Sequence, residues 1–340
     1  MIDRYHRQRI LPFIGDAGQD RLAAARVVLI GCGALGTVLA ESLARAGVGH
    51  LVLVDRDLVE LTNLQRQTLY TEADARESRP KAVAAAERLR AVNSEIQIEP
   101  RPIDVDSGNV EALLAGATLV LDGTDNAATR YLINDACLKH GLPWIYGAAL
   151  ASEGRVMPVL PGRGPCLRCV FRNMPPAGEL DTCETAGVLG PLAGIVANME
   201  MAVALRLLVS GQAPLQLHAI DAWDGRVQAI DVSDARDPDC PCCGRQHFEF
   251  LARPPADSAA LCGQDAVQIR PPVETRLDLP ALASRLASAG AVQAMPFMVR
   301  FVPREQPTLK LTAFSDGRLI VQGTRELSEA RSLYARFVGA

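Results

Sequence analysis

Short apolar runs alternate with amphipathic segments along the first half of the chain. Residues 26–30 are a β-branched run that ends at Gly31, and residues 35–45 then carry apolar side chains at helical spacing. Residues 51–54 form a second apolar run, which ends at Asp55. This order predicts a strand, a helix and a second strand, the βαβ unit of a parallel sheet.

The same alternation continues as far as residue 146. Helices are expected at 81–91, 109–115 and 127–140, and strands at 96–98, 118–121 and 144–146. Strands joined through helices pair in parallel, because the chain crosses over the sheet between them. The sequence therefore predicts an α/β fold with a Rossmann-like, doubly wound, mostly parallel sheet.

After residue 147 the pattern changes. Strand-like segments at 154–160 and 227–231 flank a long apolar helix at 191–209, and we expect this half to continue the sheet in antiparallel fashion. A proline-rich stretch then indicates a linker, and the tail alternates short apolar runs with a turn. The predicted domains are a catalytic body at 1–250, with a nucleotide-binding half at about 1–147 and a second half at about 148–250, a linker at 251–260 and a small α+β domain at 261–340.

Composition places the chain among ordinary globular proteins. Of 340 residues, 49% are hydrophobic and 22% charged, and the formal net charge of −4 provides no general attraction to nucleic acid or to an anionic membrane. The first residues lack the apolar core of a secretory signal, so we expect a cytoplasmic protein. The apolar stretch 186–209 contains Asn198, Glu200 and Arg206, which favours a buried helix over a membrane span.

Gly31, Gly33 and Gly36 form a G-x-G-x-x-G sequence between a predicted strand and a predicted helix. Such glycines allow a tight turn, and the free N–H groups of the helix start attract anionic ligand atoms. Asp55, at the end of the next strand, is suited to accept hydrogen bonds from ribose hydroxyls, and Asp57 is close enough to join it. The motif indicates a nucleotide, with NAD as the default ligand, and a glycine turn without a ligand is the alternative.

Polar residues after the second strand favour ATP over NAD. Asn63, Arg66 and Gln67 follow that strand, and Lys81 opens the next predicted helix. Guanidinium and ammonium groups can neutralise the phosphates of ATP, whereas a nicotinamide dehydrogenase has no comparable need of them. Taken singly, each residue is equally compatible with a solvated surface position.

The strand expected at 118–121 leads into Asp125 and Asn126. Open α/β sheets bind ligands at the carboxyl ends of their strands, and carboxylate oxygens are good ligands for Mg²⁺. Asp125 is therefore a candidate magnesium ligand, directly or through water. A helix cap is the alternative role for such residues.

Nine cysteines in a chain without an export signal favour metal binding or thiol chemistry over disulfides. Two C-x-x-C pairs, Cys166 with Cys169 and Cys240 with Cys243, are separated by 70 residues. Two such pairs can supply four thiolates to one tetrahedral ion, which predicts a structural zinc site. Two unrelated redox or buried pairs are the alternative.

Cys183 lies apart from these pairs, just before the long apolar helix. A helix N-terminus stabilises a thiolate, which suits a nucleophile, whereas the neighbouring Asp181 and Glu184 oppose that effect. The residues alone leave a functional and a structural role for Cys183 equally open.

Together these motifs resemble the ThiF/MoeB/HesA family, the bacterial relatives of ubiquitin-activating enzymes. The resemblance runs in order from about residue 4 to 245. It is carried by residues 4–8, the glycine loop 31–36, residues 63–67, Lys81, residues 124–126, both cysteine pairs, and Cys183 with residues 186–188.

The resemblance implies ATP- and Mg²⁺-dependent adenylylation of a ubiquitin-like sulfur-carrier protein of the ThiS or MoaD type, at its C-terminal Gly-Gly carboxylate. By family motif, Asp55 would hold the ribose, Arg66 and Lys81 the phosphates and Asp125 the Mg²⁺, with Asn63 and Gln67 lining the site. Arg7 would act as an arginine finger toward the ATP of the neighbouring subunit of a homodimer. Cys183 matches the family's crossover-loop cysteine, which in some members forms a link to the carrier.

The resemblance leaves the pathway open among thiamin, molybdopterin, tRNA and cysteine-related biosynthesis. Some relatives carry their own rhodanese domain, but the tail here has no basic cysteine loop of that kind, so we expect a separate sulfur donor, a cysteine desulfurase or a rhodanese. A peptide-adenylating enzyme of the microcin-maturing type would have the same nucleotide site. An NAD-dependent oxidoreductase is supported only by the glycine loop and Asp55.

Overall fold

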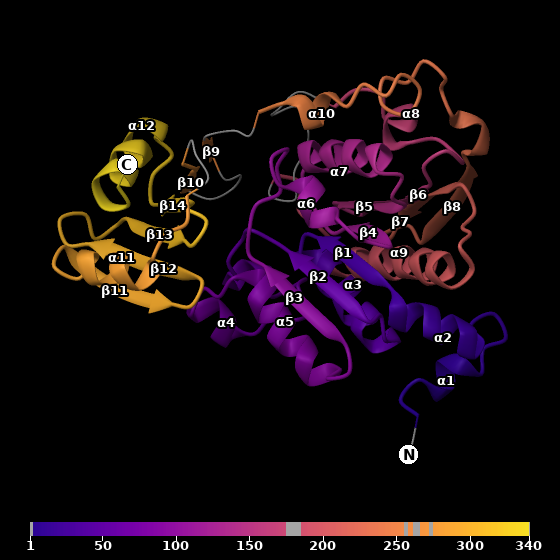
Figure 1. The fold of residues 1–340 in the computed structure, drawn as a ribbon, viewed down its shortest axis with the longest axis horizontal. Coiled ribbons are helices and arrows are strands. Elements are labelled where there is room, and N and C mark those ends of the chain that lie inside the picture. The colour runs from indigo at the N-terminus through magenta and orange to yellow at the C-terminus, as the bar shows by residue number, and fades with distance from the viewer. Residues whose placement is uncertain (1–2, 175–184, 255–257, 261–265, 272–274, 340) are drawn as a thin grey trace. The chain divides into compact units, whose positions relative to one another are not determined.

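The computed structural model describes residues 3–174, 185–254, 258–260, 266–271 and 275–339. The chain divides into two compact units, Met1–Pro254 and Pro255–Ala340 (Figure 1). Part of the range expected to be a linker has regular structure, since β9 (Ser258–Ala260) pairs with β10 (Ala266–Ile269) of the second unit.

The first unit is built on one eight-stranded sheet in the order β3-β2-β1-β4-β5-β6-β7-β8. Pairing is parallel from β3 to β5 and antiparallel from β5 to β8. This confirms the predicted α/β class and the antiparallel continuation of the sheet. The strands are β1 (Arg26–Ile30), β2 (His50–Val54), β3 (Gln97–Arg101), β4 (Leu119–Asp122), β5 (Trp144–Leu150), β6 (Glu153–Val159), β7 (Gln216–Asp221) and β8 (Arg226–Asp231).

Helices cover both faces of this sheet (Figure 1). Alternate residues of a strand point to opposite faces, and on β1 both sets are buried under helices. Val27 and Leu29 of β1 belong to the core that includes α3, α5 and α9, whereas Val28 and Ile30 belong to the core that includes α6 and α7. The helices are α1 (His6–Arg9), α2 (Gly15–Ala24), α3 (Ala34–Ala46), η1 (Leu61–Asn63), α4 (Glu72–Arg76), α5 (Lys81–Val92), α6 (Val110–Leu114), α7 (Ala127–Lys139), α8 (Leu167–Val170), α9 (Gly190–Ser210), η2 (Ser233–Ala235) and α10 (Glu249–Ala252).

The helix α9 is long and apolar enough to cross a membrane by length and composition. In the first unit, however, 61% of its most apolar window is buried. It packs on α2, α3, β5 and β6, and Glu200 in its middle is fully buried. These contacts are typical of a core helix, and they account for the apolar stretch in the sequence.

The second unit has a six-stranded sheet in the order β11-β12-β13-β14-β10-β9, with antiparallel pairing throughout. Its core joins strand residues such as Phe301 and Leu311 to Leu333 of the last helix. Besides β9 and β10, the unit contains α11 (Leu279–Leu286), β11 (Gly290–Met295), β12 (Met298–Pro303), β13 (Lys310–Phe314), β14 (Leu319–Gln322) and α12 (Leu327–Phe337).

Candidate functional site

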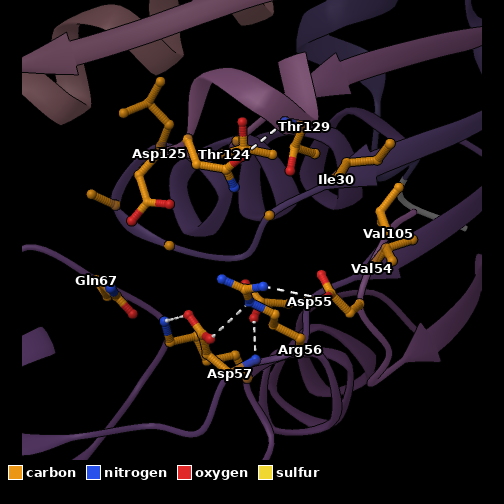
Figure 2. A pocket seen from close by; sticks show the side chains of 18 of the residues that line it. Ile30, Val54, Asp55, Arg56, Asp57, Gln67, Val105, Thr124, Asp125 and Thr129 are labelled. Carbon is orange, nitrogen blue, oxygen red and sulfur yellow. Dashed lines mark hydrogen bonds and ion pairs between the residues drawn. The ribbon is translucent and has the colours of Figure 1, made fainter. Parts of the chain in front are cut away.

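A cleft with about 850 Å³ of open space lies in the first unit, at the carboxyl ends of β1, β2 and β4 (Figure 2). Most of the residues expected to bind a nucleotide line it together. They are Gly31, Gly33, Asp55, Asp57, Arg66, Gln67, Lys81, Asp125 and Asn126.

The glycine loop is shaped by backbone crowding. Gly31 has a φ of +93°, and a Cβ there would overlap the backbone of Gly123. A Cβ on Gly36 would overlap the Gly31 carbonyl, so Gly36 serves the packing of α3 on β1 and does not line the cleft. Gly33 faces the cleft with space around its Cα. The three glycines therefore have different roles: two allow close packing and one leaves room for a ligand.

Asp55 is held by the loop that it faces. Its two carboxylate oxygens accept hydrogen bonds from the Cys32 and Asp57 backbone N–H groups, each at 2.7 Å. Burial raises the pKa of Asp55 to about 6, even though the Lys81 ammonium acts to lower it. Each carboxylate oxygen keeps a further lone pair, so Asp55 can still accept hydrogen bonds from a ligand hydroxyl.

Lys81 is a buried cation at the wall of the cleft. Its side chain is 8% exposed, and its Nζ lies 2.9 Å from Asp57 Oδ2. Burial alone would lower the pKa of Lys81, but the carboxylates of Asp57 and Asp55 outweigh burial and raise it above the usual value. Lys81 is therefore charged and already oriented without a ligand.

The turn after η1 presents Arg66 and Gln67 to the cleft, whereas Asn63 lies beneath it. Asn63 does not line the cleft, contrary to expectation: its Oδ1 accepts a hydrogen bond from Glu60 N, and its carbonyl accepts from the N–H groups of Arg66 and Gln67. Gln67 is 4% exposed, and its Oε1 has no hydrogen-bond partner among the residues that the structure describes. A buried acceptor without a partner costs about 1–3 kcal/mol, which a donor on a bound ligand would offset.

The loop after β4 carries Asp125 and Asn126. Asp125 is exposed in the cleft, and Asn126 begins α7 by accepting a hydrogen bond from Thr129 N at 2.8 Å. Below the loop, buried Asp122 pairs with Arg130, whose Nε lies 2.9 Å from Asp122 Oδ2. Burial raises the pKa of Asp122 above its usual value, although Arg130 acts to lower it. Asp125 is thus the freely accessible carboxylate of this loop.

Several residues of the cleft were not predicted from the sequence. Arg56 follows Asp55, and its Nη1 lies 3.2 Å from Oδ2 of Asp104, which follows β3. Ile103 and Val105 form an apolar wall beside this pair. The end of β3 is a strand end like the others, so the same rule that selected Asp55 and Asp125 would have found them.

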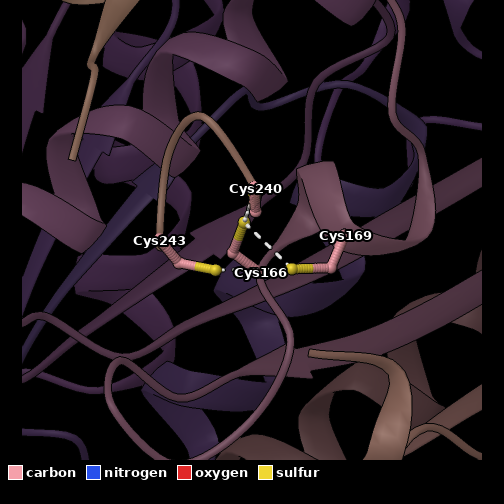
Figure 3. Close-up of side chains that lie close together, drawn as sticks. All are labelled: Cys166, Cys169, Cys240 and Cys243. Atoms are coloured by element: carbon pink, nitrogen blue, oxygen red, sulfur yellow. Dashed lines mark hydrogen bonds between the residues drawn. The ribbon is translucent and has the colours of Figure 1, made fainter. Parts of the chain in front are cut away.

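Four cysteines come together in the second half of the unit (Figure 3). The Sγ atoms of Cys166, Cys169, Cys240 and Cys243 all lie within 4.8 Å of one another. The Cys166 and Cys240 sulfurs are 3.6 Å apart, and those of Cys169 and Cys243 are 3.3 Å apart. Tetrahedral zinc with Zn–S bonds of about 2.3 Å needs sulfurs about 3.8 Å apart, so these residues fit the ion.

Two further candidates lie away from the cleft or outside the structure. Arg7 is exposed on α1 and does not line the cleft of its own chain. Cys183 falls outside the described residues, together with Asp181 and Glu184.

The geometry of this unit has counterparts in known proteins. The model of the ThiF family matches residues 5–242. The chain belongs to the ThiF family. This ThiF family member is 40% identical over 341 residues to the sulfur carrier protein ThiS adenylyltransferase of Bacillus subtilis (strain 168), with both chains covered in full. It is 41% identical over 269 residues to the sulfur carrier protein adenylyltransferase of Thermus thermophilus, covering 77% of this chain and 97% of that one.

Solved structures agree on the fold. The structure of E. coli MccB with ATP superposes with a TM-score of 0.62 at 22% identity, covering 71% of this chain and 75% of that chain. At this identity the likeness concerns the fold alone. The resemblance of the motifs to the ThiF family is confirmed by the family match and by the full-length relative.

The raised pKa of Asp55 predicts a pH-dependent stability. The unfolded chain releases the Asp55 proton near pH 4, whereas the folded chain holds it up to about pH 6. Protonated Asp55 therefore contributes to the stability of the fold below pH 4, and this contribution is lost as the pH rises through 6. Relative to Asp55→Asn, the free energy of unfolding of the native protein should fall by about 1–3 kcal/mol between pH 4 and 7.

Urea unfolding followed by tryptophan fluorescence checks this, because Trp144 and Trp223, the two tryptophans of the chain, both lie in the first unit. A stability difference between the two proteins that stays flat across this pH range would show that Asp55 ionises at its ordinary pKa.

Proposed function

We propose that this protein uses ATP to adenylylate the C-terminal carboxylate of a ubiquitin-like sulfur-carrier protein that ends in Gly-Gly. The cleft supports this function, because Lys81, Arg66 and Asp125 line the same space as the glycine loop and Asp55. The full-length similarity to a ThiS adenylyltransferase supports the choice of carrier.

The residues of the cleft suit an in-line transfer of AMP. Asp55 would hold the ribose, while the N–H groups of the glycine loop, Lys81 and Arg66 would neutralise the phosphates. An oxygen of the carrier carboxylate would attack the α-phosphorus, and the bond from that phosphorus to the pyrophosphate oxygen would break. Catalysis in such a reaction is mainly positioning and charge stabilisation. A sulfur atom supplied by a separate donor, a cysteine desulfurase or a rhodanese, would then attack the acyl carbon, and the bond from that carbon to the AMP oxygen would break as AMP leaves.

Asp125 would hold the Mg²⁺ that accompanies ATP. When bound, this ion supplies positive charge that stabilises the leaving pyrophosphate. The exposed carboxylate in the cleft and the tight loop around it are suited to that task.

Replacing Asp125 tests the function most directly. Asp125→Ala should reduce carrier-dependent exchange of pyrophosphate into ATP by at least about a hundredfold, because the ion loses its protein ligand at the reacting phosphates. Thermal melting should be unchanged, since the Asp125 side chain is exposed.

Asp234→Ala, at an exposed acid of η2, is the matched control and should exchange normally. Native protein that shows no exchange with any co-encoded Gly-Gly carrier would contradict the proposed function. Exchange that requires a peptide in place of the carrier would identify the peptide-adenylating alternative.

We further propose that the four-cysteine cluster holds a structural zinc ion. A closed site with four thiolates stabilises the folded state and leaves no position open for a substrate. Its support is the tight grouping of the four sulfur atoms, from α8 and the residue before it and from the loop at 240–243.

Removing zinc should therefore destabilise the protein. A strong chelator, or Cys243→Ser, should lower the melting temperature by roughly 10 °C or more. Elemental analysis should find one zinc per native chain. The chelator should have no further effect on Cys243→Ser, which serves as the control. Native protein without metal, and with melting insensitive to the chelator, would rule the zinc site out.

We also propose that the active form is a homodimer in which Arg7 reaches the partner's cleft. Arg7 is exposed on α1, and the segment after it exposes Ile10, Leu11 and Phe13, with Phe13 75% exposed. An apolar segment of this kind is typical of a surface that another chain covers.

Mixing inactive variants tests this arrangement. Arg7→Ala and Lys81→Ala should each be inactive, and their refolded mixture should regain about a quarter of the native exchange activity, because half of the dimers are mixed and each has one intact site. A mixture of Asp125→Ala and Lys81→Ala is the control and should stay inactive, since both changes fall in the cleft of one chain. No recovery in the first mixture would place Arg7 outside the partner's site.

A further inference from the structure

The backbone ladder between β4 and β5 ends before it reaches the cleft. The last paired residues of β4 are Val120 and Leu121. The N–H of Asp122, the next residue, also donates to Glu200 Oε1 at 3.3 Å. On β5, Gly147 pairs with β6. Beyond Leu121 no further residue of β4 pairs with β5, and a side chain bridges the two segments at the edge where Asp125 lies.

Arg130 spans this gap from the first turns of α7. Its Nη2 donates to the Thr124 carbonyl at 2.6 Å and to the Gly147 carbonyl at 3.1 Å, one on each side. Its Nε donates to Asp122 Oδ2 at 2.9 Å. The guanidinium also lies over the Tyr146 ring, 5.5 Å from its centre. A planar fork of donors can make these contacts simultaneously.

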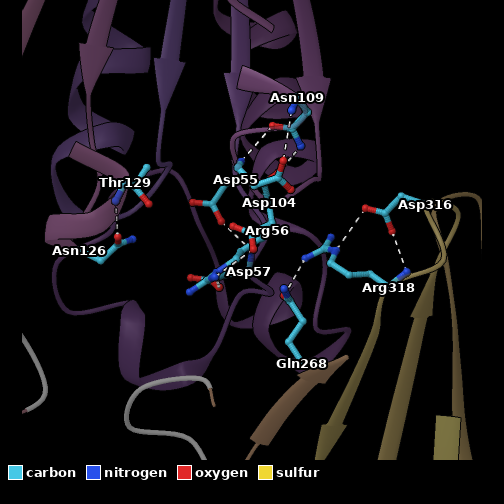
Figure 4. A network of polar contacts seen from close by, with 11 residues as sticks. Asp55, Arg56, Asp57, Asp104, Asn109, Asn126, Thr129, Gln268, Asp316 and Arg318 are labelled. Carbon is cyan, nitrogen blue, oxygen red and sulfur yellow. Dashed lines mark hydrogen bonds and ion pairs between the residues drawn. The ribbon is translucent and has the colours of Figure 1, made fainter. Parts of the chain in front are cut away.

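The loop that carries Asp125 is also anchored on each side of this residue. On one side, Asp122 Oδ1 accepts hydrogen bonds from the Thr124 N–H at 2.9 Å and from its hydroxyl at 2.6 Å. On the other side, Asn126 caps α7 through the Thr129 N–H (Figure 4). Asp125 lies between these two anchors, and its carboxylate lines the cleft.

The far side of the gap has no space for another side chain. A Cβ on Gly147 would overlap the carboxylate of Glu200, which is fully buried in α9. The absence of a side chain at Gly147 therefore leaves room for the Glu200 carboxylate at the end of β4. Arg130 of α7 thus joins the loop of Asp125 to β5, while Glu200 of α9 contacts the end of β4.

We propose that Arg130 is a positioning residue of the nucleotide site, which holds Asp125 in place by tying the Thr124 carbonyl to β5. The proposal rests on the proposed function only in that the ligand of the cleft is MgATP. Arg130 lies below the loop, and it acts on the ligand through Asp125.

Arg130→Lys separates this role from a general effect on folding. Lysine keeps a positive charge opposite Asp122, but one ammonium group cannot bridge both carbonyls and lie flat over Tyr146. MgATP binding measured by calorimetry should weaken about tenfold or more, the loss expected for charged hydrogen bonds. Amide hydrogen exchange of the nucleotide-free protein should speed up at residues 124–126 and stay unchanged elsewhere in the first unit.

Arg76→Lys is the matched control, because Arg76 is exposed on α4 and lies outside the cleft. It should change neither measurement. If Arg130→Lys does not fold, the double variant Asp122→Asn with Arg130→Gln removes both buried charges together and should show the same local rise in exchange.

Unchanged MgATP affinity and unchanged exchange at residues 124–126 in a folded Arg130→Lys protein would overturn the proposal. A uniform rise of exchange over the first unit, with the affinity of the folded fraction unchanged, would overturn it as well. If native protein binds MgATP without carrier-dependent pyrophosphate exchange, the proposed function fails while these measurements still decide the role of Arg130. Amide exchange needs no ligand, so it decides even if MgATP does not bind.

Discussion

Backbone crowding at three glycines is the constraint on which the candidate site depends. At Gly36 and at Gly123 a Cβ would overlap the Gly31 carbonyl, so the loop after β1, the start of α3 and the loop after β4 are in direct backbone contact at these glycines. This contact brings the start of α3 directly over the strand ends. Gly31, Gly33 and Gly123 therefore present main-chain groups to the cleft, and main-chain N–H groups can donate hydrogen bonds to phosphate oxygens. The side chains that surround these glycines come from the strand ends on either side.

The charges around the cleft are arranged in opposite pairs from different elements. Lys81 pairs with Asp57, and Arg130 pairs with Asp122. Burying a charge is costly unless a partner offsets the lost hydration, so each pair also fixes the geometry of the segments that carry it. A site ordered in this way needs little rearrangement when a charged ligand arrives, which favours catalysis by fixed electrostatics. Asp125 differs from these pairs, because its carboxylate is exposed in the cleft.

The sequence predicted those features that depend on local pattern. The alternation of apolar runs and amphipathic segments predicted the parallel strands, and the strand-end rule selected Asp55 and Asp125. β7 and β11 were missed, because β7 has no long β-branched run and the exposed residues of β11 leave only a weak alternation. Asn63 was expected in the cleft, although its side chain completes the turn beneath Arg66. The bridge formed by Arg130 depends on contacts with β5, which no local pattern reveals.

The helix α7 serves two sites from a single turn. Arg130 reaches the loop above the cleft, and Asn134, four residues later, donates to Cys242 Sγ and accepts from Leu167 N beside the cysteine cluster. A helix rotates by about 100° per residue, so both side chains meet their partners only at this spacing. Substitutions between them would leave the spacing intact, but inserting or deleting one residue would turn one site away from its partners. Between residues 130 and 134, a change in the number of residues is therefore more disruptive than a change in residue type.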